Sequence, residues 1–395
     1  MKVNILISLA KHAQKVIDGY QYPEPMHLTL QQYFKANKQL GSRDRRTIRN
    51  LLYSWLRLGK SLQHIEENAM LIAFALLNDD KENFQAITNE PFPEDIKAWL
   101  IAKNKENALD LLYPFCSEVS KEINLDGFVW SHLTQPALWM WSKRSNKIKE
   151  YLMNNKVDII SFADDEFALC LPNGFDLAIL PDELKNSANV QDISSQMLCR
   201  KIELNGSDKI WDCCAASGGK SLKLKSISGD FDLYVSDLRS TSIFNLHKRF
   251  KHNFIKKYHY ATIDLSNELK SVAFKNNDRV EVPVSANYFD TIVLDAPCSG
   301  SGTWSRTPEH MLNFDINTLA EIQTKQLAIV KNAWPFLKKG GKLYYMTCSA
   351  FAKENEEVIS QLKISDFKLN FQNYFEGYNH SGDTMFMACL EKMTN

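Results

Sequence analysis

Two cysteines lie in short segments of small and polar residues, each of which follows an apolar run. Cys298 belongs to the segment D-A-P-C-S-G-S-G, which begins at Asp295, and Cys348 belongs to the segment Y-M-T-C-S. An ionised thiol is a nucleophile, so these side chains are candidates for covalent chemistry. A single buried cysteine is more often part of a core. Zinc is the next alternative, but no C-x-x-C pair and no histidine at ligand spacing accompanies the two thiols, so we expect no metal.

A loop of very small residues follows another apolar run. It reads C-A-A-S-G-G-K from Cys214 to Lys220. Small side chains let a ligand approach the backbone, and the helix expected after the loop offers free N–H groups. A P-loop would need glycine at position 214, and the dinucleotide fingerprint G-x-G-x-x-G is absent, which argues against an NAD-dependent dehydrogenase. The remaining alternative to a ligand loop is an ordinary tight turn.

Four aspartates each come directly after an apolar run: Asp212, Asp237, Asp264 and Asp295. A single aspartate in this position is usually a helix N-cap. Four of them around one crevice exceed what capping requires. Asp237 follows the small-residue loop by about 20 positions, where an acidic side chain can accept hydrogen bonds from ribose hydroxyls. The pattern fits a nucleoside ligand that is bound through its sugar and its base edges.

The elements that must position these residues alternate between strands and helices from about residue 192 onward. Apolar runs at 210–211, 233–235, 258–263, 291–294 and 342–346 predict strands, and 317–337 and 353–362 predict helices. This alternation predicts a parallel, doubly wound α/β sheet. Ligands of such sheets bind outside the carboxyl ends of the strands, which is where the aspartates and cysteines are expected to gather.

The first half of the chain has a different pattern. Residues 3–117 show helical apolar spacing without strand alternation, for example at 45–58, and a further helix is expected at 95–103. Strands are expected at 137–141, 158–163 and 167–171, with a helix at 147–155. We therefore expect an all-α domain over residues 1–120, a small α+β connecting module over 121–190 and the α/β domain over 191–395.

The composition is that of a globular chain, with 44% hydrophobic and 24% charged residues and a formal net charge of zero. A disordered chain is excluded, and any contact with nucleic acid must come from local basic patches. No apolar run is long enough to span a membrane, and residues 1–10 are interpreted as the start of a helix rather than as a signal peptide. The 8 cysteines are scattered, which favours reduced thiols and a cytoplasmic protein.

Together these motifs resemble those of the RsmB/Sun family of S-adenosylmethionine-dependent RNA cytosine-C5 methyltransferases. The resemblance covers residues 190–356, and D-A-P-C-S-G-S-G and T-C-S are its most specific parts. It implies a Rossmann-like domain with a mostly parallel seven-stranded sheet, an N-terminal NusB-like domain and S-adenosylmethionine as the cofactor. The family loop usually reads A-A-P-G-G-K, and here Ser217 replaces the proline, which frees φ and adds a donor.

The resemblance also implies roles for the site residues. Cys348 would attack C6 of cytosine, which makes C5 reactive toward the methyl group, and Cys298 would help to remove the C5 proton so that the thiol can leave. Asp295 would hold the amino edge of the base and reach the cofactor end of the pocket. The residues implied in cofactor binding are Cys214, Ala215, Ala216, Ser217, Gly218, Gly219, Lys220, Asp237, Asp264 and Asp295.

Basic side chains are candidates for RNA contacts. Arg306 follows the Cys298 segment and could hold a phosphate beside the target base, the alternative being a solvated surface arginine. Two stretches could also hold RNA, or could simply be solvated faces. The first comprises Lys35, Lys38, Arg43, Arg45, Arg46, Arg49, Arg57 and Lys60, and the second comprises Arg239, Lys248, Arg249, Lys251, Lys256 and Lys257. Arg45, Arg46, Arg49, Lys248 and Arg249 are the leading candidates.

The interpretation that fits best is a monomeric RNA 5-methylcytosine methyltransferase that acts on small-subunit rRNA during rRNA processing. Because a stacked base is out of reach, the enzyme should act on a loop or flip the base out. Two alternatives stay open: a methyltransferase for tRNA or for a base nitrogen, and a non-catalytic RNA-binding or ribosome-assembly factor that keeps the fold. Methylation at nitrogen needs no covalent thiol, and binding alone needs neither Cys298 nor Cys348.

Overall fold

The N-terminal part of the chain is helical, as its apolar spacing predicts. The computed structural model describes residues 2–62, 68–104, 108–269 and 271–394. On α3 the side chains of Ile48, Leu51 and Leu52 are fully buried, because they recur on one face at helical spacing. The helices are α1 (Val3–Asp18), α2 (Met26–Ala36), α3 (Ser42–Leu62), α4 (Ala69–Leu77), α5 (Lys81–Thr88), α6 (Ile96–Asn104), α7 (Ala108–Leu112) and α8 (Leu125–Ser131).

A later segment completes this helical unit. Thr303–Asp315, with α14 (Pro308–Asn313), groups with Met1–Gln135 in one compact unit, and Pro136–Gly302 with Ile316–Asn395 form the other. In the helical unit the indole of Trp304 packs among aromatic rings, with centroids 5.9 Å from Tyr113, 5.5 Å from Phe115 and 5.2 Å from Phe314. The chain therefore leaves the second unit directly after the Cys298 segment. The division of the sequence at residues 120 and 190 stays a prediction.

The second unit contains a nine-stranded sheet, counted over the described residues, with the order β12-β13-β11-β10-β5-β6-β7-β8-β9. β11, β10, β5, β6 and β7 run parallel, and each overlaps a strand predicted from an apolar run. The strands are β5 (Lys209–Asp212), β6 (Asp232–Asp237), β7 (His259–Thr262), β8 (Val272–Lys275), β9 (Glu281–Val284), β10 (Phe289–Asp295), β11 (Leu337–Thr347), β12 (Phe367–Glu376) and β13 (Thr384–Lys392).

The sheet extends beyond the seven strands that the family resemblance implies. β8 and β9 add an antiparallel hairpin next to β7, at one edge of the sheet. Val272 and Phe274 are buried while Ala273 and Lys275 are exposed, which is the alternation of a half-buried strand. Two such short strands give a weak sequence signal, and their pairing with β7 depends on tertiary contacts.

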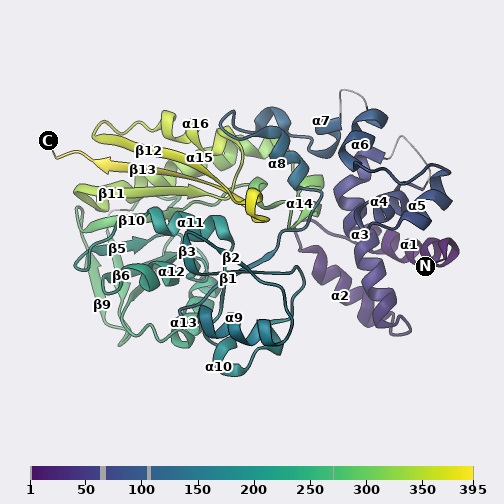
Figure 1. Ribbon diagram of the computed structural model, residues 1–395. Helices are drawn as coiled ribbons and strands as arrows, with labels where there is room; N and C mark the ends of the chain where they lie inside the picture. The colour runs from purple at the N-terminus through teal and green to yellow at the C-terminus, as the bar shows by residue number, and fades with distance from the viewer. Residues whose placement is uncertain (1, 63–67, 105–107, 270, 395) are drawn as a thin grey trace. The chain divides into compact units, whose positions relative to one another are not determined.

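Helices cover both faces of the large sheet (Figure 1). α15 (Leu319–Ala333) and α16 (Glu356–Gln361) share a core cluster with Trp211, whereas α11 (Ile193–Lys201), α12 (Gly219–Ser228) and α13 (Ser240–His252) share another with Ile210. Ile210 and Trp211 are neighbours on β5, and successive side chains of a strand point to opposite faces. The doubly wound α/β architecture predicted from the sequence is confirmed.

A smaller antiparallel sheet of order β2-β3-β1-β4 belongs to the same unit. It contains the three strands and the helix that the sequence predicts for this region. Its elements are β1 (Leu138–Trp141), α9 (Ser145–Asn154), β2 (Ile160–Phe162), β3 (Asp165–Leu171), α10 (Asp182–Lys185) and β4 (Asn189–Val190). Within the described ranges, none of the helices has the length and apolar character of a membrane span.

A buried ion pair joins the small sheet to a helix of the large one. The side chain of Lys223 on α12 is fully buried, and its Nζ lies 2.6 Å from Oδ2 of Asp165 at the start of β3. Lys223 also donates to Oε1 of Gln196 at 3.3 Å, and the guanidinium of Arg200 lies 3.5 Å from Oδ1 of Asp165. Because a desolvated charge is tolerated only when it is paired, this ion pair fixes β3 against α12.

The variant Asp165→Asn tests this role, because it leaves the Lys223 ammonium buried without a carboxylate. We expect the free energy of unfolding to fall by about 3–5 kcal/mol, measured by urea denaturation followed by circular dichroism. Asp164→Asn is the matched control, since Asp164 is exposed. Equal unfolding midpoints for the two variants would contradict a structural role of the pair.

Candidate active site

The two cysteines meet at the ends of neighbouring parallel strands. β10 and β11 pair with Asp295 opposite Met346, so the segments that follow these strands leave the sheet side by side. The sulfur atoms of Cys298 and Cys348 lie 3.3 Å apart. The juxtaposition expected from the sequence is therefore present.

The Cys298 segment lies directly against the backbone of the Cys348 segment at Gly302. The N–H of Gly302 donates to the carbonyl oxygen of Cys348 at 3.0 Å. A Cβ atom at position 302 would lie 2.2 Å from the carbonyl oxygen of Thr384 and 3.0 Å from that of Cys348. Any side chain would push these backbone segments apart, so the close approach requires glycine.

The thiol of Cys298 holds its proton at neutral pH. The hydrogen bond with the sulfur of Cys348 raises the pKa of Cys298 well above the usual value for a thiol, and burial and the negative charges of Cys348 and Glu354 raise it further. The two sulfurs lie 3.3 Å apart, and either of them can be the donor of this contact. Since an ionised sulfur is the nucleophilic form, a thiol that keeps its proton makes Cys298 the less suitable nucleophile of the pair.

A buried carboxylate to which the sequence interpretation gave no role holds both cysteine segments. Glu354 is fully buried and accepts hydrogen bonds from the N–H of Ser299 at 2.7 Å and from the Oγ atoms of Ser299 and Ser349, both at 2.5 Å. Gln326 donates to it at 3.3 Å. Burial raises the pKa of Glu354, and these hydrogen bonds oppose the rise. Each of the two serines directly follows one of the cysteines, so a single carboxylate positions both.

The small-residue loop adopts a backbone conformation that its sequence permits. Ala216 and Gly218 have φ values of 48° and 80°, in the left-handed region. The N–H of Gly218 donates to the carbonyl oxygen of Ala215 at 2.8 Å, and the N–H of Ala216 donates to Oδ2 of Asp237 at 2.9 Å. The loop thus closes as a tight turn before α12, with a strand-end carboxylate holding its backbone.

Ser217, at the position where the family usually has proline, takes part in the contacts of this loop. Its Oγ accepts a hydrogen bond from Arg249 at 3.4 Å, and the other terminal nitrogen of Arg249 donates to the carbonyl oxygen of Val190 at 3.3 Å. Burial lowers the pKa of Arg249. Arg249 was predicted to contact RNA, and the structure places it against the small-residue loop.

A cavity of about 190 Å³ opens beside the loop. Most of the residues that were predicted to bind a cofactor line it, but Gly218, Asp237 and Asp264 are not among the lining residues. The complete lining is Val190, Gln191, Ser195, Asp212, Cys214, Ala215, Ala216, Ser217, Gly219, Lys220, Arg249 and Asp295.

Two of the predicted aspartates are engaged by backbone and side-chain donors. Oδ1 of Asp237 accepts a hydrogen bond from the N–H of Arg239 at 3.0 Å. Asp264 accepts from the N–H of Ser266 at 2.9 Å and from the side chain of Asn267 at 2.8 Å. Asp264 therefore stabilises the turn after β7. This is a local structural role, like the capping role that is usual for a single aspartate after a strand.

Lys220 and Asp295 form an ion pair in the cavity, with Nζ 2.5 Å from Oδ2. Burial by itself would lower the pKa of Lys220, but the Asp295 carboxylate outweighs it, and the pKa is raised. The lysine stays charged and holds one oxygen of Asp295, so the carboxylate is fixed in orientation.

Asp212, which ends β5, is a buried acid with one unpaired oxygen. The Oγ of Ser221 donates to Oδ2 at 2.6 Å, whereas Oδ1 is buried and has no hydrogen-bond partner. Burial raises the pKa of Asp212 to about 7, with the hydrogen bond from Ser221 and the charge of Lys220 opposing that rise. A buried acceptor without a donor is costly, so this atom marks a place where a ligand can donate.

The predicted RNA-binding residues differ in exposure. Arg46 and Arg49 on α3 and Lys248 on α13 are exposed, whereas Arg45 donates to the carbonyl oxygen of Leu40 at 2.9 Å. Arg306 belongs to the segment that groups with the helical unit.

Arg57, from the first basic stretch, is buried and donates to the carbonyl oxygen of His132 at 2.9 Å. Its burial lowers its pKa to about 10. Arg57 is therefore part of the helical interior and not of a surface. The side chain of Lys60 lies outside the described residues.

The catalytic segments lie within a known sequence family. Residues 200–386 match the family model described as 16S rRNA methyltransferase RsmB/F. This part of the chain belongs to the RsmB/F methyltransferase family. The family predicted from the cysteine motifs is thereby confirmed for this range, and both cysteine segments and the small-residue loop lie inside it.

Curated relatives of this chain carry a related name. The chain is 30% identical over 272 residues to ribosomal RNA small subunit methyltransferase B of Proteus mirabilis, with 65% of this chain and 60% of that protein covered. It is 31% identical over 180 residues to the probable ribosomal RNA small subunit methyltransferase B of Bacillus subtilis, with 43% of this chain and 36% of that protein covered. The chain thus spans about three fifths or less of the length of these relatives.

Solved structures share the fold. The crystal structure of PH0851 has a TM-score of 0.70 and 16% identity and covers 99% of both chains. A methyltransferase homolog from Pyrococcus horikoshii has a TM-score of 0.56 and 17% identity, covering 74% of this chain and 97% of its own. NSun6 from Pyrococcus horikoshii with SFG has a TM-score of 0.57 and 13% identity, covering 71% and 97%. These likenesses confirm the Rossmann-like methyltransferase fold of the RsmB/F domain.

Replacing Glu354 tests whether it positions the cysteine segments. Glu354→Ala leaves the buried donors of Ser299 and Ser349 without an acceptor, so we expect a loss of about 3 kcal/mol in the free energy of unfolding and faster labelling of Cys298 and Cys348 by a thiol reagent. The measurements are urea denaturation and peptide mapping after a short labelling pulse. Glu357→Ala is the control, since Glu357 is exposed on α16. Unchanged stability together with unchanged labelling would show that Glu354 has no such role.

The pKa of Asp212 predicts a pH dependence of stability. This pKa is about 7 in the folded chain and 3.8 ordinarily, so the contribution of Asp212 is fully present below about pH 4 and is lost as the pH rises through 7. Between pH 5.5 and 8.5 the free energy of unfolding of the wild type should fall by about 2 kcal/mol relative to that of Asp212→Asn, whose side chain cannot ionise. Urea denaturation at both pH values measures this, with exposed Asp230→Asn as the control. If the difference in the free energy of unfolding between wild type and Asp212→Asn does not change with pH, the pKa of Asp212 is not raised.

Proposed function

We propose that this chain transfers a methyl group from S-adenosylmethionine to C5 of a cytosine in RNA, with small-subunit rRNA as the substrate. The observation that carries the proposal is the contact of 3.3 Å between the sulfurs of Cys298 and Cys348. Asp295, which precedes Cys298 in the same segment, lines the cavity next to the small-residue loop. Membership of residues 200–386 in the RsmB/F family and the names of its relatives support this reaction.

The residues of the cavity fit the cofactor. The unpaired, buried Oδ1 of Asp212 is an acceptor for the ammonium of the methionyl part, and the tiny side chains of Ala215, Ala216 and Gly219 leave the backbone open to a ligand. When bound, S-adenosylmethionine supplies an electrophilic methyl group on a sulfonium. The loop 214–220 would hold it, and no chelating or redox group is needed for this transfer.

Cys348 would act as the nucleophile. Its thiolate forms a bond to C6 of the cytosine, and the electrons displaced from the C5–C6 double bond make C5 able to accept the methyl group. The S–H of Cys298, whose sulfur lies 3.3 Å away, would donate to this thiolate and stabilise it before attack. Asp295, which is fixed by Lys220, is placed to accept a hydrogen bond from the amino group of the base through its second oxygen.

Cys298 would then remove the C5 proton. In the resting pair its pKa is raised chiefly by the hydrogen bond with Cys348 and, after burial, by the charge of Cys348. Once the sulfur of Cys348 is bonded to carbon, it carries no charge, so the pKa of Cys298 falls and its proton can pass to solvent. The resulting thiolate accepts the C5 proton, the C5–C6 double bond re-forms, and the bond between Cys348 and C6 breaks.

The test is incubation of the protein with radiolabelled S-adenosylmethionine and small-subunit rRNA. We expect no labelled product from Cys348→Ala, because attack on C6 is lost. Cys298→Ala should accumulate a protein–RNA adduct that survives denaturing electrophoresis, because attack proceeds while release fails. Cys116→Ala serves as the control, since Cys116 belongs to the helical unit.

The position of the label decides between reaction classes. Digestion of the RNA to nucleosides should show 5-methylcytidine. Near-normal turnover by Cys348→Ala would overturn the assignment of the nucleophile. Label on a ring nitrogen or on ribose would overturn the reaction class, and labelling of tRNA but not of rRNA would overturn the substrate.

A further inference from the structure

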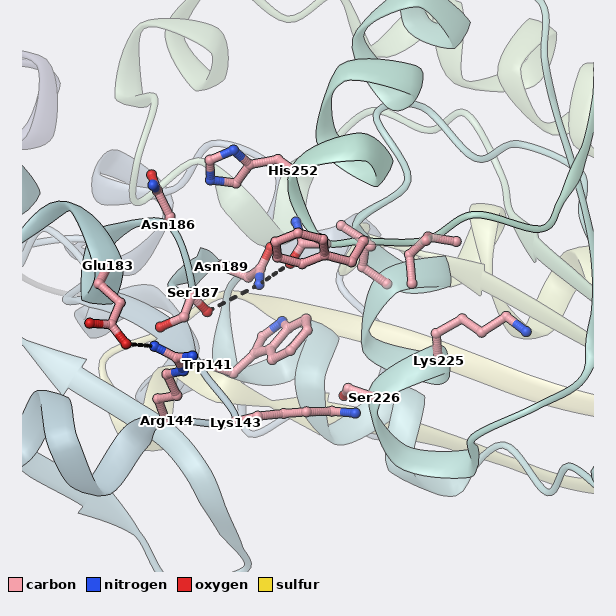
Figure 2. Close-up of a pocket in the computed structure, with 14 residues that line it drawn as sticks. Trp141, Lys143, Arg144, Glu183, Asn186, Ser187, Asn189, Lys225, Ser226 and His252 are labelled. Atoms are coloured by element: carbon pink, nitrogen blue, oxygen red, sulfur yellow. Dashed lines mark hydrogen bonds and ion pairs between the residues drawn. The ribbon is translucent and has the colours of Figure 1, made fainter. Parts of the chain in front are cut away.

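A larger cavity, of about 420 Å³, lies in the second unit and has no role in the proposed reaction. Its lining comes from the end of β1 and the residues after it, from α10 and the residues up to β4, from α12, and from the end of α13 and the residues after it (Figure 2). It contains cationic side chains, amide side chains and two large aromatic rings. Such a mixture of apolar surface and few polar groups is typical of a ligand site.

Shared lining residues connect this cavity to the cavity beside the small-residue loop. A shallow depression on α13 and β4 shares Asn189, His252 and Asn253 with the large cavity, and shares Val190 and Arg249 with the loop cavity. A single track of lining residues therefore runs from the proposed methylation site along α13 to the large cavity. Exposed Lys248 lines the depression between them.

Basic side chains outnumber acidic ones around the large cavity. Lys143, Arg144 and Lys225 line the large cavity, and the one acidic residue among its lining, Glu183, is paired with Arg144, as the dashed line in Figure 2 shows. Together with Lys248 in the depression, this arrangement suits a ligand that carries a series of negative charges, as a nucleic-acid backbone does.

One aromatic residue of the cavity wall, Trp141, is largely buried, with 4% of its surface exposed. Figure 2 shows the indole of Trp141 in the middle of the labelled residues, with Lys143 and Arg144 on one side and Asn186 and His252 on the other. The Nε1 of Trp141 donates to Gln191 at 2.8 Å, which fixes the plane of the ring.

Phe254 supplies the second ring, and its environment is unusual. Its side chain is 83% exposed, and its φ is 58°, a value that a bulky residue rarely adopts. A large apolar side chain in contact with water gains free energy when a nucleobase stacks on it.

We propose that this cavity binds an unpaired nucleotide of the RNA substrate, close in sequence to the target cytosine. The inference rests on the proposed function. The base stacks on Phe254, and Lys143 holds the phosphate. A methyltransferase that acts on an unpaired cytosine must also hold the neighbouring unpaired nucleotides, and stacking together with cationic groups is how proteins do so.

The test compares two double variants in RNA binding. Phe254→Ala with Lys143→Ala removes a stacking ring and a cation from the cavity, whereas Val280→Ala with Lys368→Ala removes an exposed apolar side chain and an exposed lysine elsewhere in the same unit. Binding of a fluorescein-labelled single-stranded RNA is measured by anisotropy at fixed salt. We expect the Kd to rise about tenfold for the cavity variant and to stay within twofold of the wild-type value for the control. An unchanged Kd for the cavity variant would overturn the proposal.

Steady-state kinetics separate this proposal from the proposed function. The cavity variant should show a higher KM for RNA with kcat and the KM for S-adenosylmethionine unchanged. The wild-type protein could bind RNA and yet transfer no methyl group, while the cavity variant loses RNA binding. That pair of results would refute the proposed function and leave the nucleotide site standing. Normal methylation and normal RNA binding by the cavity variant would refute the nucleotide site alone.

Crosslinking locates the nucleotide and identifies its source. RNA that contains 4-thiouridine should crosslink on irradiation to the peptides that contain Trp141 or Phe254. A crosslink that maps only to other peptides would contradict the proposal. Free adenosine monophosphate and cytidine monophosphate should compete only weakly, and displacement of the RNA by micromolar mononucleotide would show that the cavity is a site for a free nucleotide and overturn the RNA assignment.

Discussion

The parallel pairing of β10 with β11 is the constraint on which the site depends. Parallel neighbours end at the same edge of the sheet, so residues that follow both strands must share one small volume. Cys298 and Cys348 are far apart in sequence, yet this pairing and the hydrogen bond from Gly302 to Cys348 bring their sulfurs to 3.3 Å. No local interaction could hold two loops at that distance.

The buried carboxylate of Glu354 converts this proximity into a defined geometry. Burying an ionisable acid is costly, and the donors from Ser299, Ser349 and Gln326 compensate the loss of water. The same negative charge also helps to keep the proton on Cys298. One carboxylate thus influences both the position of the sulfur pair and the protonation of Cys298.

The chain path links the catalytic segment to the helical unit. Directly after Gly302 the chain contributes Thr303–Asp315 to that unit, where Trp304 packs among aromatic rings. A segment that follows the Cys298 loop in the sequence therefore contributes to the aromatic packing of the helical unit.

The sequence by itself determined the type of fold and the main reactive groups. Apolar runs that end in aspartate or cysteine predict the five parallel strands, because a strand buried on both faces must be apolar, and the two cysteine segments predict a shared crevice. The tertiary structure decided the rest. It gave Glu354 its partners, buried Arg57, placed Arg249 against the small-residue loop and added the hairpin of β8 and β9. These outcomes depend on which distant residues become neighbours and lose their contact with water. A charged or polar side chain looks the same in a sequence whether it is solvated or buried against a partner.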